Sequence, residues 1–450
     1  MKSRVLVIGA GLAGVEASNF LSQRNIEVVL IECKRVKLNP AQKINSFAEL
    51  VCTNSLKSKD PNSAHGLLKT EMKTLGSLVL AKAQESSVPA GDALAVDRDQ
   101  FSKLITESIE DNNLISVINE EVSDPLAIAE KHSCQHIIIA TGPLTTDSLS
   151  AWIQAEVSGE DFYFYDAIAP VVDADSLDLS KLYFKDRHKP VTETADYLNA
   201  PMTEDEYYRF VEALVEAEKV KPKDFEEEKF FEACLPIDLM AERGKDTPRF
   251  SCMKPIGLEQ DEENPPFAVV QLRKENLLGS SFNLVGFQTR LKYPEQLRVF
   301  RMIPGFENAQ FNHLGSVHRN SFLNARKVLN WDMSTQKFPQ IHFAGQITGV
   351  EGYTESAASG LYVAYQVYKK ILDKTFSQFP VESALGALVN YIMTNNRPAP
   401  SNINFGLIPP VALSKEQRRD RRNRKKVKKR LASERGQKIF REFIQNEGII

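Results

Sequence analysis

The stretch SRVLVIGAGLAGVEASNFLSQRNIEVVLIE, residues 3–32, decides the fold of this chain. It begins with an apolar run rich in Val and Ile, which is typical of a strand buried on both faces. A glycine-rich turn, residues 9–14, follows this run and leads into a helical pattern that ends near Leu21. A second strand-like run, residues 26–31, ends at Glu32. This order of strand, glycine-rich turn, helix and strand predicts a dinucleotide-binding βαβ unit.

The residues of the turn have predicted tasks in holding a dinucleotide. Gly9 permits the tight turn, Gly11 lets the backbone approach a pyrophosphate, and Gly14 lets the helix pack closely on the strand. The pyrophosphate would lie at the helix N-terminus, where free N–H groups point outward. Glu32 would accept hydrogen bonds from a ribose, which disfavours a 2′-phosphate and indicates FAD or NAD. The candidate cofactor-binding residues here are Gly9, Ala10, Gly11, Leu12, Ala13, Gly14 and Glu32.

Two later segments favour FAD over NAD. HIIIATGP, residues 136–143, is typical of a strand that ends in a turn, and QIHFAGQ, residues 340–346, repeats the pattern. ITGVEGY then leads into a predicted helix, residues 354–370, whose small residues allow close packing against another backbone. In a two-dinucleotide flavoprotein both turns would return to the cofactor. They add the candidates Thr141, Gly142, Gly345, Gln346 and Gly349.

The composition is that of a globular protein without cross-links. Hydrophobic residues make up 42% and charged residues 26% of the 450 residues. The five cysteines are scattered without a CxxC pair, which argues against a disulfide framework, a zinc ribbon or a plain flavin disulfide reductase. No metal site is predicted. No stretch approaches the ~18 apolar residues of a membrane span, and the chain opens on a strand rather than a signal peptide, so we expect a cytoplasmic protein.

The charge is unevenly distributed along the chain. Residues 415–435 hold twelve Lys and Arg against three Asp and Glu, a net charge of +9, whereas the rest of the chain carries −12. Such a segment is typical either of contact with a polyanion or of a solvated helix. We expect a helix over most of residues 414–443, with few apolar residues between the cations to anchor it: Val427, Leu431 and Ala432. This favours phosphate contact.

These signals predict an α/β fold. We expect a Rossmann-like FAD-binding domain, with a doubly wound parallel sheet, that carries an inserted smaller α+β domain. The turns of the first domain must converge on one cofactor, so the chain has to leave that domain and return to it. The predicted boundaries are 1–189 and 329–412 for the two parts of the FAD-binding domain, 190–328 for the inserted domain, and 413–450 for a basic helical tail.

Over roughly residues 3–410 the chain also resembles a known family. The sequence is similar to TrmFO, the bacterial folate- and FAD-dependent tRNA (uracil-C5)-methyltransferases, which are relatives of the larger GidA/MnmG flavoproteins. The motifs that carry the resemblance are FAELVCTNSLKS (47–58), VPAGDALAVDR (88–98), IIATGPLT (138–145), FYDAIAPVV (164–172), FFEACLPID (230–238), MKPIGL (253–258), AVVQLR (268–273), NLVGFQTRLKYPEQ (283–296), RMIPGFE (301–307), HRNSF (318–322) and HFAGQITGVEGYTESAASG (342–360).

The resemblance implies a reaction. A one-carbon unit would pass from 5,10-methylenetetrahydrofolate to C5 of the T-loop uridine of tRNA, position 54, with NAD(P)H reducing the FAD. By the same resemblance, Cys234 is the nucleophile toward uridine C6, and Cys52 is an acid, a base or a partner on the flavin side. Cys33, Cys134 and Cys252 are expected to be packing residues, because free cysteines are among the most buried residues.

Some expectations stay open. The family motifs add weaker pocket candidates, and basic residues elsewhere are weaker candidates for anion contact: Asn54, Ser55, Lys57, Asp97 and Arg98 for the pocket, and Lys292, His318 and Arg319 for an anion. The same chemistry on a 23S rRNA uridine is one alternative, and a flavin-binding RNA-interaction factor without methyltransferase activity is another. The sequence does not distinguish a monomer from a homodimer.

Overall fold

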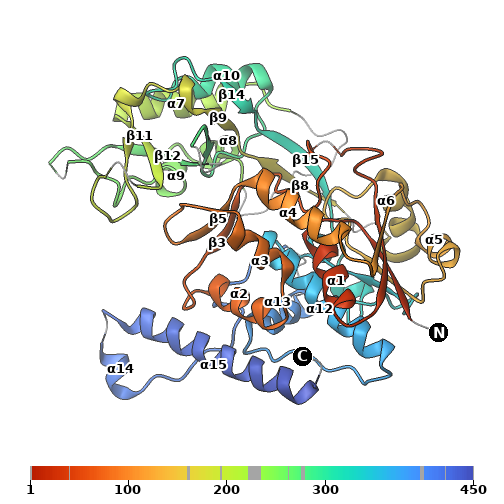
Figure 1. Ribbon diagram of the computed structural model, residues 1–450. Helices are drawn as coiled ribbons and strands as arrows, with labels where there is room; N and C mark the ends of the chain where they lie inside the picture. The colour runs from red at the N-terminus through yellow and green to blue at the C-terminus, as the bar shows by residue number, and fades with distance from the viewer. Residues whose placement is uncertain are drawn as a thin grey trace.

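The computed structural model describes most of the chain as two packed units and a C-terminal helix pair (Figure 1). The described residues are 3–39, 41–159, 163–192, 195–220, 235–261, 263–274, 279–395, 400–420 and 422–448.

The first unit is built on a five-stranded parallel sheet with the strand order β16-β7-β1-β2-β6. The strands are β1 (Arg4–Ile8), β2 (Glu27–Glu32), β6 (Ile115–Asn119), β7 (His136–Ile139) and β16 (Ile341–Phe343). Strand β1 pairs in parallel with both β2 and β7, and β16 pairs with the far edge of β7. The chain therefore leaves this sheet after β7 and returns to it about 200 residues later, as the sequence predicts.

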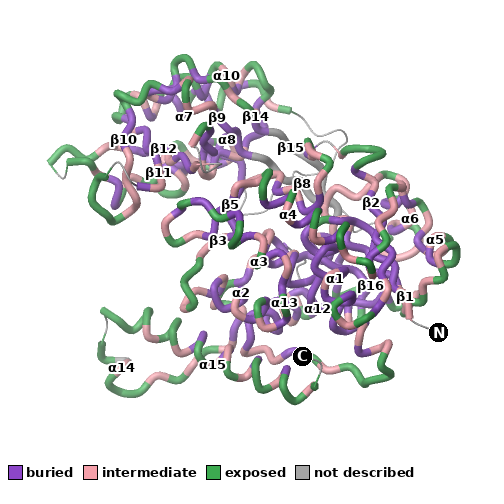
Figure 2. Tube along the Cα trace, viewed as in Figure 1, coloured by how far each residue is buried: buried purple, intermediate pink, exposed green. Residues whose placement is uncertain are grey.

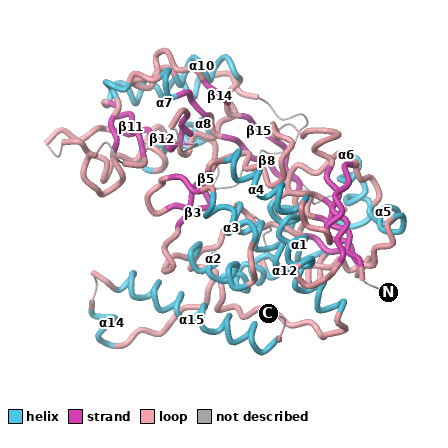
Figure 3. The backbone as a smooth tube through the Cα atoms, viewed as in Figure 1, coloured by secondary structure: helices cyan, strands magenta, loops and turns pink. Residues whose placement is uncertain are grey.

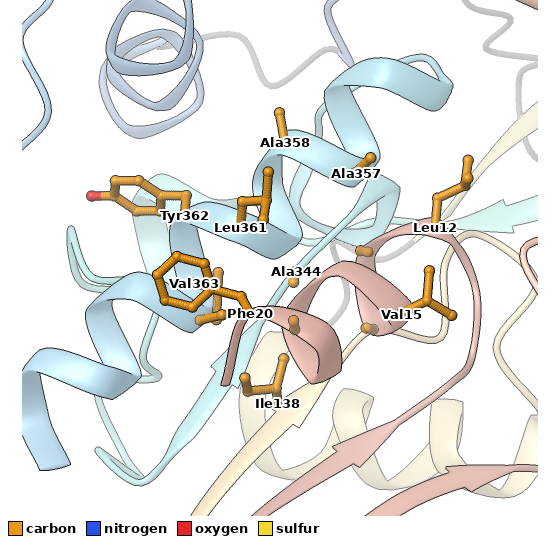
Figure 4. Close-up of a cluster of buried hydrophobic side chains, with 14 of the residues drawn as sticks. Leu12, Val15, Phe20, Ile138, Ala344, Ala357, Ala358, Leu361, Tyr362 and Val363 are labelled. Atoms are coloured by element: carbon orange, nitrogen blue, oxygen red, sulfur yellow. The ribbon is translucent and has the colours of Figure 1, made fainter. Parts of the chain in front are cut away.

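Helices cover both faces of this sheet. Figure 3 shows α1 (Leu12–Ser22) and α12 (Tyr353–Ile371) on one side of the strands, and α5 (Pro125–Lys131) and α6 (Asp147–Ile153) on the other. This arrangement confirms the predicted doubly wound α/β fold. Residues of α1, β7 and α12 share one apolar core (Figure 4).

The contact between α1 and α12 is unusually close. A Cβ atom placed on Gly360 would lie only 2.2 Å from the main-chain oxygen of Ala13. Only glycine therefore fits at this position of α12. The small-residue pattern of the predicted helix 354–370 thus serves helix packing directly against the helix that follows the glycine-rich turn.

A small antiparallel sheet and further helices also belong to the first unit. The sheet has the order β3-β5-β4. Its strands are β3 (Ser55–Ser58), β4 (Ser87–Val88) and β5 (Ala93–Val96). The helices are α2 (Ala64–Thr74), α3 (Leu78–Glu85), α4 (Arg98–Glu110), α11 (Ala325–Val328) and α13 (Ala384–Thr394). Within the described part of the chain, no helix is long and apolar enough to cross a membrane.

The second unit is a six-stranded sheet with its own core. Its order is β10-β11-β12-β13-β9-β14, and every described pairing is antiparallel. The strands are β9 (Val171–Asp173), β10 (Tyr183–Phe184), β11 (Tyr197–Met202), β12 (Ala268–Lys274), β13 (Ser281–Leu284) and β14 (Phe311–His313). The helices are α7 (Glu204–Glu216), α8 (Ile237–Arg243), α9 (Thr247–Phe250) and α10 (Tyr293–Phe300). Buried Phe210, Phe287 and Phe300 lie in its core.

Two strands join the units. Strands β8 (Tyr163–Ile168) and β15 (Ser316–Ser321) pair antiparallel with each other and lead into and out of the second unit. The inserted α+β arrangement agrees with the expected fold class. Because β9 and β10 belong to its sheet and precede residue 190, we propose that the inserted unit begins earlier, near residue 170.

The C-terminal segment differs from the expected single, weakly anchored helix. It forms α14 (Lys415–Arg419) and α15 (Arg424–Glu447), which are separate helices. The first turns of α15 are exposed, whereas Phe440 and Ile444 near its end are buried (Figure 2). The apolar anchor that the sequence reasoning missed therefore lies beyond the basic run.

Candidate dinucleotide site and the cleft at Cys52

The glycine-rich turn after β1 can be built only with glycine at two positions. Gly9 has φ +100°, and its N–H donates to the main-chain oxygen of Ile31 at 2.7 Å. A Cβ atom on Gly9 would lie 2.7 Å from the main-chain oxygen of Ala140, and one on Gly14 would lie 1.8 Å from that of Gly9. The turn, the start of α1 and the end of β7 therefore form one tightly packed structure.

Gly11 differs from these two glycines because the space around it is open. It is exposed at the start of α1, and a Cβ atom placed on it would lie no closer than 3.9 Å to the nearest atom, the main-chain oxygen of Ala140. A cavity of about 80 Å³ lies beside it, lined by Gly9, Gly11, Glu32, Thr141 and Thr145 among others. The start of a helix favours anions, since its first N–H groups have no partner within the helix. The space therefore fits a pyrophosphate.

Glu32 joins the end of β2 to the turn. One carboxylate oxygen accepts a hydrogen bond from the N–H of Ala10 at 2.7 Å, and the other accepts one from the N–H of Lys34 at 2.8 Å. The side chain is almost fully buried yet lines the cavity. A carboxylate has about four lone-pair sites, so Glu32 can hold the turn and still accept from a ribose hydroxyl.

The remaining residues of the turn contribute through the main chain. Ala10, Leu12 and Ala13 are buried, so their side chains belong to the core rather than to the cavity. The structure thus places all seven candidates of residues 9–32 around one helix start, with Gly11 and Glu32 at the cavity itself.

The turn after β7 lies at the same cavity. Thr141 lines it, and the Thr141 hydroxyl lies 2.7 Å from that of Thr145. Gly142 has φ +69°, and a Cβ atom placed on it would have no atom within 4 Å. Thr141 therefore lies at the cavity beside Gly11, and Gly142 is the next residue of the same turn.

Only part of the turn after β16 lies near the cavity beside Gly11. A Cβ atom on Gly345 would lie 3.0 Å from that of Ala13, so this residue approaches the start of α1. The side chain of Gln346 donates to Glu351 at 2.7 Å. Gly349 lines a different, smaller cavity with Leu323 and Tyr391. The structure therefore brings Gly345 toward the dinucleotide site and places Gly349 elsewhere.

Cys52 lies on the wall of a larger cavity between the two units. This cleft has a volume of about 360 Å³. Residues of both units line it, including Lys43, Leu50, Cys52 and Arg98 from the first unit and Val171, Tyr293 and Phe311 from the second. A ligand in this cleft would contact the sulfur-bearing loop and the inserted sheet together.

The start of α12 holds the loop that carries Cys52. The Tyr353 hydroxyl accepts hydrogen bonds from the N–H groups of Cys52 at 2.7 Å and Thr53 at 3.1 Å. Burial raises the pKa of Tyr353, so its hydroxyl is neutral at physiological pH. The position of Cys52 is therefore tied to the same helix that packs on α1.

A buried pair ties this loop to the inserted unit. The side-chain oxygen of Asn54 accepts from Arg273 of β12 at 2.8 Å, and its amide nitrogen donates to the main-chain oxygen of Lys274 at 2.9 Å. Arg273 also bonds the Thr53 hydroxyl. Asn54 is fully buried at the junction of the units, where its side chain serves this contact, and its place in a cofactor pocket stays a prediction.

Sequence reasoning missed Arg273. It ends the AVVQLR motif, but 219 residues separate it from Asn54. A single sequence gives no sign that two such distant residues meet.

Of the other four cysteines, the structure describes three. Cys234 lies outside the described residues. Burial is the main cause that raises the thiol pKa of Cys33 to about 11, of Cys134 to about 11 and of Cys252 to about 12. These three thiols stay protonated at neutral pH, which agrees with the expected packing role.

The weaker candidates have mostly structural roles. Asp97 caps α4 by accepting from the N–H groups of Asp99 and Gln100. Arg98 donates to the main-chain oxygen of Leu50 at 3.0 Å and lines the cleft. Lys292 forms an exposed ion pair with Glu218 at 2.7 Å.

The remaining candidate residues do not extend the description of either cavity. Ser55 accepts from the N–H of Lys57 at 3.0 Å. His318 and Arg319 lie on β15, and their side chains are outside the described part. Among the described residues, no group of three or more His, Cys, Asp or Glu is placed to hold a metal ion.

The fold and the site together define a dinucleotide-binding protein of the flavoprotein type. The defining features are the parallel sheet with an open helix start, the acidic residue at the end of β2 and the inserted antiparallel unit. Residues 4–375 match the profile of the family described as GIDA, Glucose inhibited division protein A. The fold also matches the crystal structure of Aquifex aeolicus GidA in form II, with a TM-score of 0.67 at 15% identity, over 100% of this chain and 74% of that one.

Two relatives narrow the assignment. The chain is 49% identical to "Methylenetetrahydrofolate--tRNA-(uracil-5-)-methyltransferase TrmFO" of Caldicellulosiruptor bescii, over 90% of this chain and 91% of the relative. It is 47% identical to the protein of the same name from Natranaerobius thermophilus, over 99% of this chain and 100% of the relative. The chain belongs to the GidA family and, within it, to the TrmFO proteins.

Proposed function

We propose that this protein is an enzyme that transfers a one-carbon unit from 5,10-methylenetetrahydrofolate to C5 of a uridine in tRNA, with FAD as cofactor and NAD(P)H as reductant. The observation that carries the proposal is the 47–49% identity, over at least 90% of the chain, to relatives whose names state a folate-dependent tRNA uracil methylation. The site geometry agrees with it, because a dinucleotide site and a cysteine-lined cleft occur in one molecule.

The residues of the turn fit FAD. The open space at Gly11 would take the pyrophosphate at the start of α1, and Glu32 would accept from the ribose. When bound, FAD would supply the electrons that reduce the one-carbon unit to a methyl group.

The two cysteines would activate the uridine. Uridine C5 is a poor nucleophile until a thiolate adds at C6, and we assign this addition to Cys234. Cys52, on the cleft wall, is the proposed acid or base that handles the C5 proton. Because Tyr353 and the Asn54–Arg273 pair fix the Cys52 loop, its sulfur would need no rearrangement before the reaction.

The finer assignments extend this proposal. We propose the T-loop uridine, position 54, as the target and the T-arm of tRNA as the docking partner, in the cytoplasm. A 23S rRNA uridine and a flavin-binding factor without methyl transfer are the competing functions, and no observation of the structure favours either.

A covalent trap tests the proposal. A T-arm RNA that contains 5-fluorouridine should form a covalent complex with the wild-type protein in the presence of the folate, because a C5 fluorine cannot leave as a proton does. Cys234→Ala should form no complex while keeping its FAD. Cys252→Ala, which removes a half-buried thiol of the inserted unit, is the control that should still form the complex. A Cys234→Ala protein that methylates at a near-normal rate would show that the assignment is wrong.

A further inference from the structure

The C-terminal helix pair divides sharply into a charged and a neutral part. Residues 415–430, which we call the basic arm, hold eleven Lys and Arg against two acidic residues, a net charge of +9. Residues 431–448, which we call the docked half, hold three of each and are neutral. One continuous helix, α15, runs across this division. The two parts therefore share a backbone but not a chemical character.

The docked half is fastened to the first unit. Phe440 is fully buried, and its ring lies 5.5 Å from that of Phe379 in an edge-on contact. A Cβ atom on Gly436 would lie 2.7 Å from the main-chain oxygen of Glu382, so the helix backbone touches the body there. At the far end, Glu447 pairs with buried Lys369 at 2.5 Å. These contacts fix the direction of the whole helix.

The basic arm has no such support. Its described cations are all exposed: Lys415, Arg419, Arg422, Arg424, Lys425, Lys426, Lys428, Lys429 and Arg430. Of these nine, only Arg430 has an acidic partner in the described part of the chain, Glu434 at 3.0 Å, and that pair is half exposed. In Figure 1 the arm projects from the body at the lower left. Eight of these nine cations therefore have no acidic partner within the described part of the chain.

The face of α15 that packs on the body becomes cationic in the arm. Ala432, Gly436, Phe440 and Ile444 are buried at a spacing of four residues. The same face, continued toward the start of the helix, carries Lys428 and Lys425. Both are exposed because the body no longer covers the helix at this point. These lysines thus face the side of the arm on which the body lies.

We propose that the basic arm is a rigid, preoriented contact for the phosphate backbone of the RNA substrate. The inference rests on the proposed function, which supplies a tRNA as the partner. A dense set of exposed cations neutralises phosphates and releases counterions, which gives affinity without reading sequence. Because the docked half fixes α15, the arm residues on that helix, 424–430, lose little conformational freedom when they bind.

The composition of the arm favours RNA over an anionic membrane. A helix that lies in a membrane interface needs an apolar face of Trp, Phe or Leu opposite its cations. Val427 is the one large apolar residue between Lys415 and Arg430. The arm therefore has nothing to insert between lipid chains.

A pair of matched double variants tests the arm. Lys425→Gln/Lys428→Gln removes two arm cations, and Lys438→Gln/Arg441→Gln removes two exposed cations of the docked half on the same helix. Binding of an unmodified tRNA transcript is measured for each over a range of salt concentrations. We expect the arm variant to bind roughly tenfold or more weakly at ~0.1 M salt, with a salt slope flatter by about 1.4–1.8. The control should match wild type.

Two results would overturn the arm proposal. One is an arm variant with wild-type tRNA affinity and salt slope. The other is an arm variant that keeps its tRNA affinity but loses binding to phosphatidylglycerol vesicles, which would assign the arm to membranes. Failure of the proposed function would look different: wild type would bind tRNA through the arm yet form no 5-methyluridine. Flavin reduction by NAD(P)H should be equal in all variants.

Discussion

The glycine-rich turn near the start of the chain and helix α15 near its end are both short segments with a marked composition, yet the sequence predicts them unequally well. The turn has the geometry that its glycines imply, with Gly9 at φ +100° and Gly14 against the oxygen of Gly9. For α15 the sequence predicts a weakly anchored basic helix, and its second half is instead part of the core of the first unit.

The two segments differ in whether nearby residues or distant residues determine their structure. A turn of this kind is dictated by steric limits within a few residues, so its glycines alone define it. A helix takes its role from what it packs against, and that partner is elsewhere in the chain. The predictions below test this contrast.

The largest effect is expected from a methyl group in the closed part of the turn. Gly14→Ala places a Cβ where only 1.8 Å separates it from the oxygen of Gly9. Since backbone cannot yield as a flexible side chain does, we expect a loss of more than about 3 kcal/mol in the free energy of unfolding. Chemical denaturation of the protein measures it. A variant as stable as wild type would show that the turn is looser than described.

The next effect separates the two halves of the C-terminal helix. Phe440→Ala removes a fully buried ring and should lower the free energy of opening α15 by about 3 kcal/mol, near the lower end for such a change because a terminal helix can relax. Val427→Ala, in the basic arm, should change it by less than about 0.5 kcal/mol. Amide hydrogen exchange along α15 measures both. Equal protection of α15 in the two variants would contradict the claim that packing on the first unit holds the docked half but not the arm.

A change at the open part of the turn should affect ligand binding and not folding. Gly11→Val puts a side chain into the space beside the cavity, so we expect FAD affinity to fall at least about a hundredfold, or about 2.8 kcal/mol. The flavin absorbance of the purified protein reports it, and the melting temperature without flavin should match that of flavin-free wild type. A yellow Gly11→Val protein would contradict the assignment of this space to the pyrophosphate.

The smallest effect concerns acid. Burial raises the pKa of Glu447, but hydrogen bonds from Lys369, Ser377 and Tyr365 outweigh it, so the pKa lies below its usual value. A carboxylate with a lowered pKa in the folded state adds stability above its unfolded pKa of about 4.3, and this is lost as the pH falls through the folded value. Protection of α15 should therefore decline below about pH 4.

The control for this acid effect is Glu447→Gln. It should be less protected than wild type at neutral pH and show a weaker decline in acid. A decline of the same size in both proteins would assign the acid sensitivity to other carboxylates.

Much of the fold and part of the site follow from the sequence. The parallel sheet, the return of β16 to β7 and the turns at Gly9–Gly14 and Thr141 are where the pattern predicts them. The sequence also predicts an inserted unit, but two strands of its sheet, β9 and β10, precede the predicted boundary at residue 190. The stripe Ala432, Gly436, Phe440 and Ile444 is also present in the sequence at helical spacing, but the high density of cations obscures it.

Other features have no local signal. The Asn54–Arg273 contact joins residues 219 positions apart, and the cleft at Cys52 exists only because two separate sheets meet there. Gly349 stands in a family-like motif, yet its position beside α13 (Ala384–Thr394) depends on how the chain packs after β16. Such contacts depend on the tertiary structure, which a single sequence does not specify residue by residue.

The central claim is that the dinucleotide site and the cysteine-lined cleft together methylate a tRNA uridine. The most direct measurement is mass spectrometry of an unmodified tRNA transcript after incubation with the FAD-loaded protein, 5,10-methylenetetrahydrofolate and NADPH or NADH. The account predicts 5-methyluridine at the T-loop position, and none when the folate is omitted. A transcript that stays unmodified with both NADPH and NADH would contradict the claim, whether or not a 23S rRNA fragment gains 5-methyluridine under the same conditions.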